Sequence, residues 1–456
     1  MFIDFLLEIF SKEEHETKEA IIWKDQVYTY TWLLNRIFFW REEIEKKKIA
    51  FGSVVAIEGD FSPNAVALLL ALIERGCILI PLTKSVHAKE KKFLEIGQVE
   101  IIFSFGKEDE GHFKRLEVKA DHELYQKLRE RKHPGLVLFS SGTTGESKGA
   151  VHDVVPLLEK FKTARKSLRS ITFLLFDHIG GVNTLFYLLS NRGCLVTVQK
   201  RTPDEVLGAI EKYRVQLLPT SPTFINLILL SEAYKRYDLD SLDLITYGTE
   251  PMPEGTLHQL HKIFPRVRLA QTYGLSEIGI VGSKSRSSQS LWMKIGGKGF
   301  QTRVKKGLLE VKAESAMLGY LNASSPFTED GWFKTGDVVE MDGEYFRILG
   351  RKSEVIHVGG ERVYPAEVES VIQELPDVLE TFVYGEKHPT LGNIVCVKVR
   401  LAENIGEKEF KRLLKERCQS SLRAYQIPVK VFVVQEKMYG ERFKKERFTK
   451  AHTIKN

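Results

Sequence analysis

The sequence predicts a multidomain protein of the α/β and α+β classes: a large N-terminal domain of α/β sheet layers with a small β-barrel-like part, then a small α+β domain. Apolar runs typical of buried strands alternate with helical patterns through most of the chain, as in α/β proteins. Short strands and tight turns replace them near the end of the large domain. We place this β-rich part at about 295–350, the large domain at 1–350 and the small one at 351–456.

Composition and charge limit the classes of function. Of the 456 residues, 43% are hydrophobic and 28% are charged, the balance of a globular protein with more than one core. Lysine and arginine number 67 against 60 acidic residues, and the formal charge of +7 favours an anionic partner such as a nucleotide. No basic stripe with interleaved aromatic residues is present, so we expect no nucleic-acid partner.

The N-terminal residues 1–10 are apolar but interrupted by acids, without a basic leader or a small-residue cleavage site. They predict an amphipathic surface helix, not a secretory signal. The longest strongly apolar stretch, at 65–73, has about half the length that spanning a bilayer requires. We therefore expect a core helix there, a following strand at 77–82, and no integral membrane segment.

The cysteines stand far apart in the sequence and form no C-x-x-C pair. This spacing favours reduced thiols in a cytoplasmic protein over a zinc site or a disulfide framework. The four residues are Cys77, Cys194, Cys396 and Cys418.

A loop rich in glycine and hydroxyl groups, at 140–149, follows an apolar strand at 136–139. Its glycines let main-chain N–H groups approach an anion closely, and the hydroxyls and Lys148 add further donors, so we predict a phosphate-binding loop. It is not the Walker loop, because Gly145 precedes the lysine by three positions and Gly149 follows it. The alternative is a solvated linker, but linkers seldom follow a buried strand directly.

After this loop, helical spacing at 157–168 precedes a strand at 171–176 that ends in Asp177, His178 and a pair of glycines. Ligands in open α/β sheets bind at the carboxyl ends of strands, so His178 is a candidate for orienting a carboxylate substrate. The alternative is a histidine that is hydrogen-bonded within the strand end.

Two further strands end in polar, glycine-containing turns. A loop that leads into a helix at 217–230 precedes strands at 244–247 and around 267–270. The turns that follow these strands are 248–250 and 271–277. Both are candidates for ligand-binding turns.

Hairpins are predicted in 302–350, around residues 306–307 and 342–343, and Asp-Gly at the second position is a strong hairpin signal. Between them lies the segment 335–337, which ends in Asp337. A carboxylate suits vicinal hydroxyls because it only accepts hydrogen bonds and has two oxygens. The alternative is a simple turn.

The last part of the chain predicts an α+β unit followed by a basic tail. We expect helices at 366–375 and 408–422, with strands near 378–385, 393–401 and 429–434. The basic tail at 438–447 is either part of a site or a solvated, charged terminus.

Taken together, six ordered segments resemble those of the adenylate-forming (AMP-binding) enzymes: acyl-CoA synthetases above all, firefly luciferase, and the adenylation domains of nonribosomal peptide synthetases. The segments are 140–149, 176–181, 248–250 with 271–277, 331–337, 351–369 and 438–447. The resemblance covers nearly the whole chain, and the order and spacing of the segments make it specific. Four positions depart from the usual pattern: Ser147 for proline, Ser276 for threonine, Ser353 for a hinge Asp or Lys, and Phe443 for glycine.

This resemblance implies an ATP site with Mg²⁺. Tyr273 is implied to lie against the adenine, Asp337 to bind both ribose hydroxyls, and Arg351 to contact the ribose or a phosphate. Glu277 is implied to ligate the metal, which prefers few carboxylates together with phosphate oxygens and waters. The residues implied to bind ATP are Ser140, Ser141, Gly142, Thr143, Thr144, Gly145, Lys148, Gly248, Thr249, Glu250, Gln271, Thr272, Tyr273, Gly274, Ser276, Asp337 and Arg351.

An acyl pocket is also implied. Its lining residues would be His178, Val182, Tyr247 and Leu275, with Leu185 and Ile278 beside them. These side chains suggest an apolar or aromatic acid, although apolar residues are equally typical of an ordinary core. The pair Phe176-Asp177 is similar to the one with which amino-acid-activating domains hold the substrate ammonium.

The small domain is implied to be mobile, with a hinge near Ser353 and with Gly359 and Gly360 beside a tunnel for coenzyme A. The catalytic lysine is implied at Lys444, with Lys445 as the alternative. The implied catalytic set is Lys148, His178, Glu277 and Lys444.

The expected activity is the ATP-dependent conversion of a carboxylic acid to an acyl-adenylate with release of pyrophosphate, then transfer of the acyl group to a thiol. Coenzyme A is the first choice of acceptor. The phosphopantetheine of a carrier protein is the alternative, since a basic small domain suits an acidic partner. A luciferase-like oxygenase and a catalytically weak nucleotide-binding homologue are the other hypotheses, and the departures at Ser147, Ser353 and Phe443 favour the latter.

Overall fold

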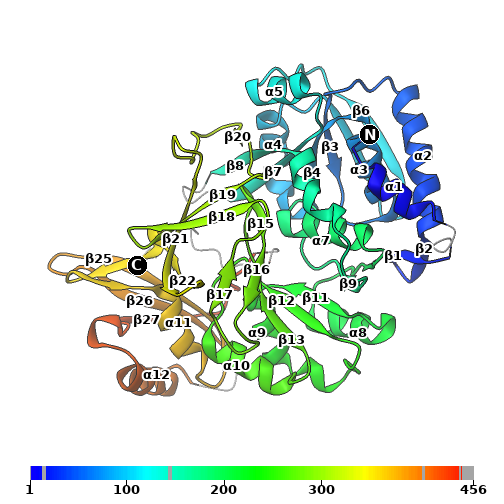
Figure 1. Cartoon of the computed structure of the whole chain (residues 1–456). Helices are drawn as coiled ribbons and strands as arrows, with labels where there is room; N and C mark the ends of the chain where they lie inside the picture. Colours follow the sequence, from blue (N-terminus) through cyan, green and yellow to red (C-terminus); the bar gives the residue numbers. More distant parts are fainter. Residues whose placement is uncertain (1, 13–16, 142–145, 403–405, 441–442, 444–456) are drawn as a thin grey trace.

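A computed structural model gives the fold of the chain and describes residues 2–12, 17–141, 146–402, 406–440 and 443 (Figure 1). Among these residues no helix combines the length and the apolar character needed to cross a membrane. All four cysteines are buried and free, in keeping with the reduced thiols that their spacing predicts.

The first sheet has seven strands in the order β20-β8-β7-β4-β3-β5-β6. The four strands β7, β4, β3 and β5 run parallel, whereas β6, β8 and β20 pair antiparallel with their neighbours. Its strands are β3 (Val54–Glu58), β4 (Ile78–Leu82), β5 (Ile101–Phe105), β6 (Gly111–Arg115), β7 (Gly135–Ser141), β8 (Ser147–Asp153) and β20 (Gly319–Tyr320). Since β20 comes from far along the chain, this sheet joins distant segments of the sequence.

The second sheet also has seven strands, in the order β13-β12-β11-β9-β10-β1-β2. All neighbours are parallel except β1 and β2, which form a hairpin. Its strands are β1 (Glu19–Trp23), β2 (Gln26–Thr29), β9 (Arg169–Ile171), β10 (Cys194–Val196), β11 (Leu217–Thr220), β12 (Leu244–Tyr247) and β13 (Arg268–Gln271).

Helices pack between these two sheets and on their outer faces. The helices α1 (Asp4–Phe10), α2 (Tyr30–Lys46), α3 (Pro63–Arg75) and α7 (Ile179–Ser190) share one apolar core with residues of both sheets. The outer face of the first sheet packs on α4 (Glu90–Ile96) and α5 (Glu123–Arg131). The outer face of the second packs on α8 (Pro203–Tyr213), α9 (Pro222–Ser231) and α10 (Glu254–Ile263).

Helix α3 shows why this layer forms. It is apolar on nearly every side, so burial between two sheets suits it better than a surface position. Ser62 caps its first turn by accepting the Ala65 N–H, and Pro63 starts the helix with a suitable φ. Gly76, at φ +81°, ends it in the left-handed conformation that glycine adopts without strain.

A third sheet of six antiparallel strands, in the order β16-β17-β22-β21-β19-β18, forms the predicted β-rich part. The hairpin turn at 306–307 falls where the sequence predicts it, whereas the second turn is 343–344, one residue beyond the predicted position, because Asp342 still pairs with Tyr345. The strands are β16 (Ser283–Ser285), β17 (Met293–Ile295), β18 (Phe300–Lys305), β19 (Leu308–Ala313), β21 (Phe333–Asp342) and β22 (Tyr345–Arg351).

The C-terminal unit is a sheet with two helices and its own apolar core, beside α10 in Figure 1. In it β26 pairs antiparallel with β25 and β23 and parallel with β27. Its elements are β23 (Ile356–Val358), β24 (Glu361–Val363), α11 (Pro365–Gln373), β25 (Val378–His388), β26 (Gly392–Leu401), α12 (Glu407–Ser421) and β27 (Lys430–Val434).

Four expectations about local structure are wrong. The loop expected at the start of 217–230 is the strand β11 (Leu217–Thr220). The helix expected at 157–168 ends early: α6 covers Val154–Leu158, a 3-10 turn covers Glu159–Lys162, and the chain beyond is irregular. The strand expected at 171–176 is Arg169–Ile171. The turn at 271–277 contains the short strand β14 (Tyr273–Leu275), paired with β15 (Gly279–Val281).

Candidate active site

The β7–β8 hairpin holds the predicted phosphate loop at its tip. Ser140 pairs with Lys148 and Ser141 with Ser147, so strand structure extends further into the motif than its composition predicts. Lys148 is half-buried in β8. Residues 142–145, which include Gly142, Thr143, Thr144 and Gly145, lie outside the described residues.

Tyr320 connects Lys148 with Glu277. Its strand β20 pairs with β8, and the Lys148 ammonium lies 5.2 Å from the centroid of the Tyr320 ring. The Tyr320 hydroxyl donates a hydrogen bond of 2.6 Å to Glu277 Oε1. Burial, and then the neighbouring Glu277 carboxylate, raise the pKa of Tyr320 well above its usual value, so the hydroxyl stays a proton donor. One tyrosine thus contacts both a cation and a carboxylate of the predicted site.

His152 supports the segment that carries Glu277. Its ring is fully buried, and Nε2 lies 2.5 Å from the carbonyl oxygen of Ser276. Burial lowers the pKa of His152, so the ring is neutral and Nε2 donates to that carbonyl. The backbone on the other side of Glu277 is fixed as well, because its carbonyl accepts the Met317 N–H at 2.7 Å.

Asp337 is buried in a second polar cluster, within β21. Tyr273 donates its hydroxyl to Asp337 Oδ2 at 2.6 Å, and Arg351 Nε lies 2.8 Å from Oδ1. Arg351 also donates from Nη1 to the Thr335 carbonyl at 3.1 Å. Each carboxylate oxygen can accept more than one hydrogen bond, which is the chemistry expected of a group that binds hydroxyls.

Two turns meet where β12 and β13 end. Tyr247 carries the turn 248–250, and its carbonyl accepts the Thr272 N–H at 2.8 Å. A Cβ on Gly248 would lie 2.6 Å from Thr272 Oγ1, so only glycine fits this close approach. Thr249 has φ +72°, an unusual conformation for a β-branched residue and one that is concentrated at functional sites.

Of the other residues predicted to bind ATP, some have groups available to a ligand and others have structural contacts. Gln271 is buried, and its Oε1 has no hydrogen-bond partner among the residues that the structure describes, which leaves an acceptor for a ligand donor. Gly274 is packed against Gly279 and Ile280, where a Cβ would clash. Glu250 accepts the Thr223 N–H at 2.8 Å and so stabilises the start of α9.

At the predicted acyl pocket, His178 is the N-cap of α7. Its Nδ1 accepts the Gly180 N–H at 3.1 Å, so in the neutral ring the proton is assigned to Nε2. This contact fixes the ring at the start of α7, seven residues beyond the end of β9 and not at the strand end that the sequence predicts. Val182 and Tyr247 are buried, and Leu275 is half-buried.

Asp177, the residue that suggests an ammonium site, lies buried and accepts the Thr83 hydroxyl at 2.9 Å. Thr83 directly follows β4, so this contact ties the first sheet to the segment before α7. The carboxylate therefore already has a structural role.

In the small domain, Gly359 and Gly360 form the turn between β23 and β24, at φ +58° and +91°. Ser353 lies exposed in a 3-10 turn, Lys352–Glu354, between the third sheet and this hairpin. Lys444 and Lys445 lie outside the described residues.

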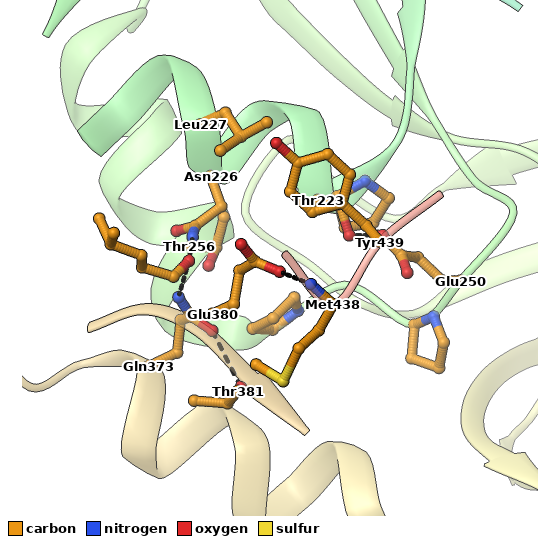
Figure 2. A pocket seen from close by; sticks show the side chains of 14 residues that line it. Thr223, Asn226, Leu227, Glu250, Thr256, Gln373, Glu380, Thr381, Met438 and Tyr439 are labelled. Carbon is orange, nitrogen blue, oxygen red and sulfur yellow. Dashed lines mark hydrogen bonds between the residues drawn. The ribbon is translucent and has the colours of Figure 1, made fainter. Parts of the chain in front are cut away.

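A pocket between the two parts of the chain, shown in Figure 2, is a separate feature. Its walls come from α9, the segment before α10, β25 and the chain at 438–439. Of the predicted site residues only Glu250 lines it. It is therefore a gap at the domain interface, away from Lys148, Glu277 and Asp337.

The donor set around Glu277 fits Mg²⁺ in a nucleotide complex. No group of three or more His, Cys, Asp or Glu side chains suited to a metal occurs in the described part of the chain. Mg²⁺ needs no such group, because it binds one or two carboxylates together with substrate phosphates and waters.

Tyr320 belongs to the candidate site, although no motif in the sequence singles it out. It stands in a short Gly-Tyr segment, and only its pairing with β8 brings it beside Lys148. Ser221 and Phe443 are a second such pair, since the Ser221 hydroxyl donates to the Phe443 carbonyl at 2.8 Å.

Two family models match the chain. The model of the AMP-binding enzyme family matches residues 10–305, and that of the AMP-binding enzyme C-terminal domain matches 367–440. An indoleacetate–CoA ligase of Aromatoleum aromaticum is 27% identical over 440 residues, 84% of this chain and 85% of its own. A 2-succinylbenzoate–CoA ligase of Bacillus pumilus is 26% identical over 456 residues and covers 91% of both chains.

Solved structures show the same fold. An anthranilate CoA ligase, AuaEII, bound to anthranoyl-AMP has a TM-score of 0.81 at 19% identity, over 96% of this chain and 94% of that one. The o-succinylbenzoate CoA synthetase of Bacillus subtilis has a TM-score of 0.76 at 21% identity, over 97% and 96%. The resemblance predicted from the sequence is confirmed, and the chain belongs to the AMP-binding enzyme family.

Proposed function

We propose that this protein is an acid–thiol ligase that uses ATP to convert a carboxylic acid to an acyl-adenylate, releases pyrophosphate, and transfers the acyl group to coenzyme A. The observation that carries the proposal is the Lys148–Tyr320–Glu277 cluster beside the phosphate loop. The family models and the CoA ligases among the relatives support it.

In the first step the substrate carboxylate attacks the α-phosphorus of ATP, and both reactants are anions. Lys148 and the N–H groups of the loop offset charge on the leaving pyrophosphate, and Lys444 offsets charge on the α-phosphate and the acyl oxygen. Mg²⁺ held by Glu277 would neutralise phosphate charge further. Alignment of the two reactants can itself contribute about 7–11 kcal/mol to catalysis.

The nucleoside lies between the Asp337 cluster and the turns 248–250 and 271–277. Asp337 accepts the ribose hydroxyls, and Arg351, already paired with it, holds the carboxylate in place. Gln271 offers its buried Oε1 to the adenine amine, and the Tyr273 ring lies against the base. Tyr273 does this while its hydroxyl stays on Asp337.

The acid is of the aromatic or apolar class. His178 orients its carboxylate, and the α7, β12 and β14 residues Val182, Tyr247 and Leu275 line the pocket. The relatives act on indoleacetate and 2-succinylbenzoate, which agrees with this side-chain set.

Thioester formation uses the small domain, residues 351–456. It turns about Ser353, withdraws Lys444 from the adenylate and brings Gly359 and Gly360 beside the pantetheine arm of coenzyme A. Two left-handed glycines leave the backbone of this turn open to a close ligand. The choice of Lys444 over Lys445 is supported by Phe443, which has φ +47°, the conformation expected of the glycine that it replaces.

The test is pyrophosphate release from ATP and Mg²⁺ across aryl, fatty and amino acids, each with and without coenzyme A. We expect release with an aryl or apolar acid, multiple turnovers only when coenzyme A is present, and loss of release in Lys148→Ala. Pyrophosphate release without multiple turnovers in the presence of coenzyme A would indicate that the acceptor is a carrier protein and not coenzyme A. ATP binding without release for any acid would contradict the ligase.

A further inference from the structure

Phe443 has a backbone conformation that is rare for its residue type. Its φ is +47°, in the left-handed region where a Cβ is crowded and glycine is favoured. Its N–H donates to the Gly440 carbonyl at 2.9 Å, which closes a turn just before Lys444. Something else in the structure must therefore hold phenylalanine in this conformation.

The Phe443 ring packs in an aromatic cluster on the large domain. Its centroid lies 5.3 Å from that of Phe173 and 5.2 Å from that of Phe224, the latter at an interplanar angle of 77°. Phe173 and Phe224 are both buried in the core of the second sheet. Tyr439 stacks on the same ring at 5.4 Å and 23°. Edge-to-face and offset pairs at these distances stabilise the contact beyond simple burial.

The backbone of Phe443 is held by α9, the helix that contains Phe224. The Ser221 hydroxyl donates to the Phe443 carbonyl at 2.8 Å and accepts the Phe224 N–H at 3.2 Å as the N-cap of α9. The carbonyl so fixed belongs to the peptide that joins Phe443 to Lys444. The ring contact with Phe224 and the hydrogen bond from Ser221 together hold Phe443 at the start of α9.

The chain just before this turn is held by the small domain. The Met438 N–H donates to Glu380 Oε2 at 2.7 Å, as Figure 2 shows, and Glu380 pairs with Arg400 of β26. Met438 is thus held by the small domain, whereas Phe443 is held by the large one. Few other polar links are described across this interface, among them Asn226 Nδ2 to the Leu379 carbonyl at 3.0 Å.

We propose that Phe443 is a positioning residue that docks the C-terminal segment on Phe173, Phe224 and Ser221 and so holds Lys444 for the adenylation step. The inference rests on the proposed function. Because the small domain must turn for thioester formation, this docking serves only the first half-reaction. Where the family pattern has glycine, this chain carries a side chain that stabilises one of the two domain arrangements.

The test separates the two half-reactions in Phe443→Ala. We expect acid-dependent exchange of pyrophosphate into ATP to fall about tenfold or more, because Lys444 loses its alignment. Thioester formation from a preformed acyl-adenylate should change less than about twofold, since Lys444 has left the site by then. Phe443→Leu keeps an apolar side chain and should restore part of the exchange. Val429→Ala, at a residue of the small domain that is 68% exposed, is the matched control and should change neither rate.

A second measurement does not depend on activity. Amide hydrogen exchange in peptides covering 431–440 should be faster in Phe443→Ala and in Ser221→Ala than in the wild-type protein and in Val429→Ala. Equal loss of both half-reactions in a folded Phe443→Ala, or unchanged amide exchange in this segment, would overturn the proposal. If the wild-type protein shows no pyrophosphate exchange with any acid, the proposed function fails, and amide exchange alone decides whether the ring docks the segment.

Discussion

Tyr320 contacts both Lys148 and Glu277, so the positions of these two side chains depend on it. Its ring lies under the Lys148 ammonium and its hydroxyl donates to Glu277, so it fixes two groups of opposite charge without pairing them with each other. A direct Lys148–Glu277 ion pair would satisfy both groups internally and reduce their attraction for phosphate and metal. The tyrosine keeps them close and available.

We therefore expect Tyr320→Phe to lower the rate of adenylation about 10–100-fold, since a hydrogen bond to a charged group is worth roughly 1.5–3 kcal/mol. The ring, and with it the cation–π contact to Lys148, remains. Steady-state pyrophosphate release at varied Mg²⁺ measures the effect, and a raised Mg²⁺ requirement should accompany it. Tyr28→Phe, at a hydroxyl bonded to Gln26, is the control. A Tyr320→Phe enzyme with wild-type kinetics would refute this role.

The burial of His152 leads us to expect that the free energy of unfolding depends on pH. Burial depresses its folded pKa below the ordinary value of about 6.5, so the unfolded chain binds a proton that the folded protein does not. The stabilising contribution is complete above about pH 6.5 and is lost as the pH falls toward the folded pKa, by up to about 1.4 kcal/mol per pH unit.

Urea unfolding between pH 5 and pH 8 measures this slope. In His152→Gln, whose amide can still donate to the Ser276 carbonyl, the acid-side slope should be smaller by about one proton. Identical slopes in the two proteins would show that His152 binds a proton as readily in the folded protein as in the unfolded chain, which would contradict this prediction.

At the scale of elements, the turns at the ends of β12 and β13 form one unit. Gly248 lies so close to Thr272 that even a methyl group would separate them. Gly248→Ala should therefore raise KM for ATP several-fold while the protein stays folded, as measured by pyrophosphate release and thermal unfolding. Gly208→Ala, in α8, where an added Cβ finds Tyr237 at 3.4 Å, is the matched control and should be neutral or slightly stabilising. Equal KM values for the two variants would contradict the argument.

The sequence is informative for some elements and not for others, for physical reasons. Strands such as β4 and β12 and helix α3 are predicted because local apolar patterns and capping residues determine them. The β20–β8 pairing is not predicted, because it joins residues more than 160 positions apart through backbone hydrogen bonds that leave no local pattern. The helix expected at 157–168 ends early for a similar reason: helical spacing alone does not show that the chain must leave α6 and enter β9.

The same distinction applies to the site. Lys148, Glu277, Asp337 and Arg351 follow from motif chemistry, and the structure brings each of them into a polar cluster. Tyr320 and the Ser221–Phe443 contact depend on tertiary packing, so they emerge only from the structure. For Phe443 the sequence shows a departure from the family pattern, whereas its meaning comes from the ring cluster and the value of φ.

At the scale of the whole molecule, the two seven-stranded sheets share a layer of helices, and the third sheet with the C-terminal unit lies against them (Figure 1). In the Lys148–Tyr320–Glu277 cluster, Lys148 and Tyr320 come from β8 and β20 of the first sheet. The Asp337 cluster draws on β14, β21 and β22. The site is thus assembled where separate layers meet.

In the proposed reaction the acid is activated as an acyl-adenylate before the thiol attacks. The most direct measurement uses an aryl acid labelled with ¹⁸O in both carboxylate oxygens, with ATP, Mg²⁺ and coenzyme A, and mass spectrometry of the nucleotide product. Because the carboxylate oxygen that attacks the α-phosphorus stays on phosphorus when the thiol displaces AMP, we expect one ¹⁸O in AMP and the other in the thioester carbonyl. Formation of ADP with ¹⁸O in inorganic phosphate, or AMP without label, would contradict the account.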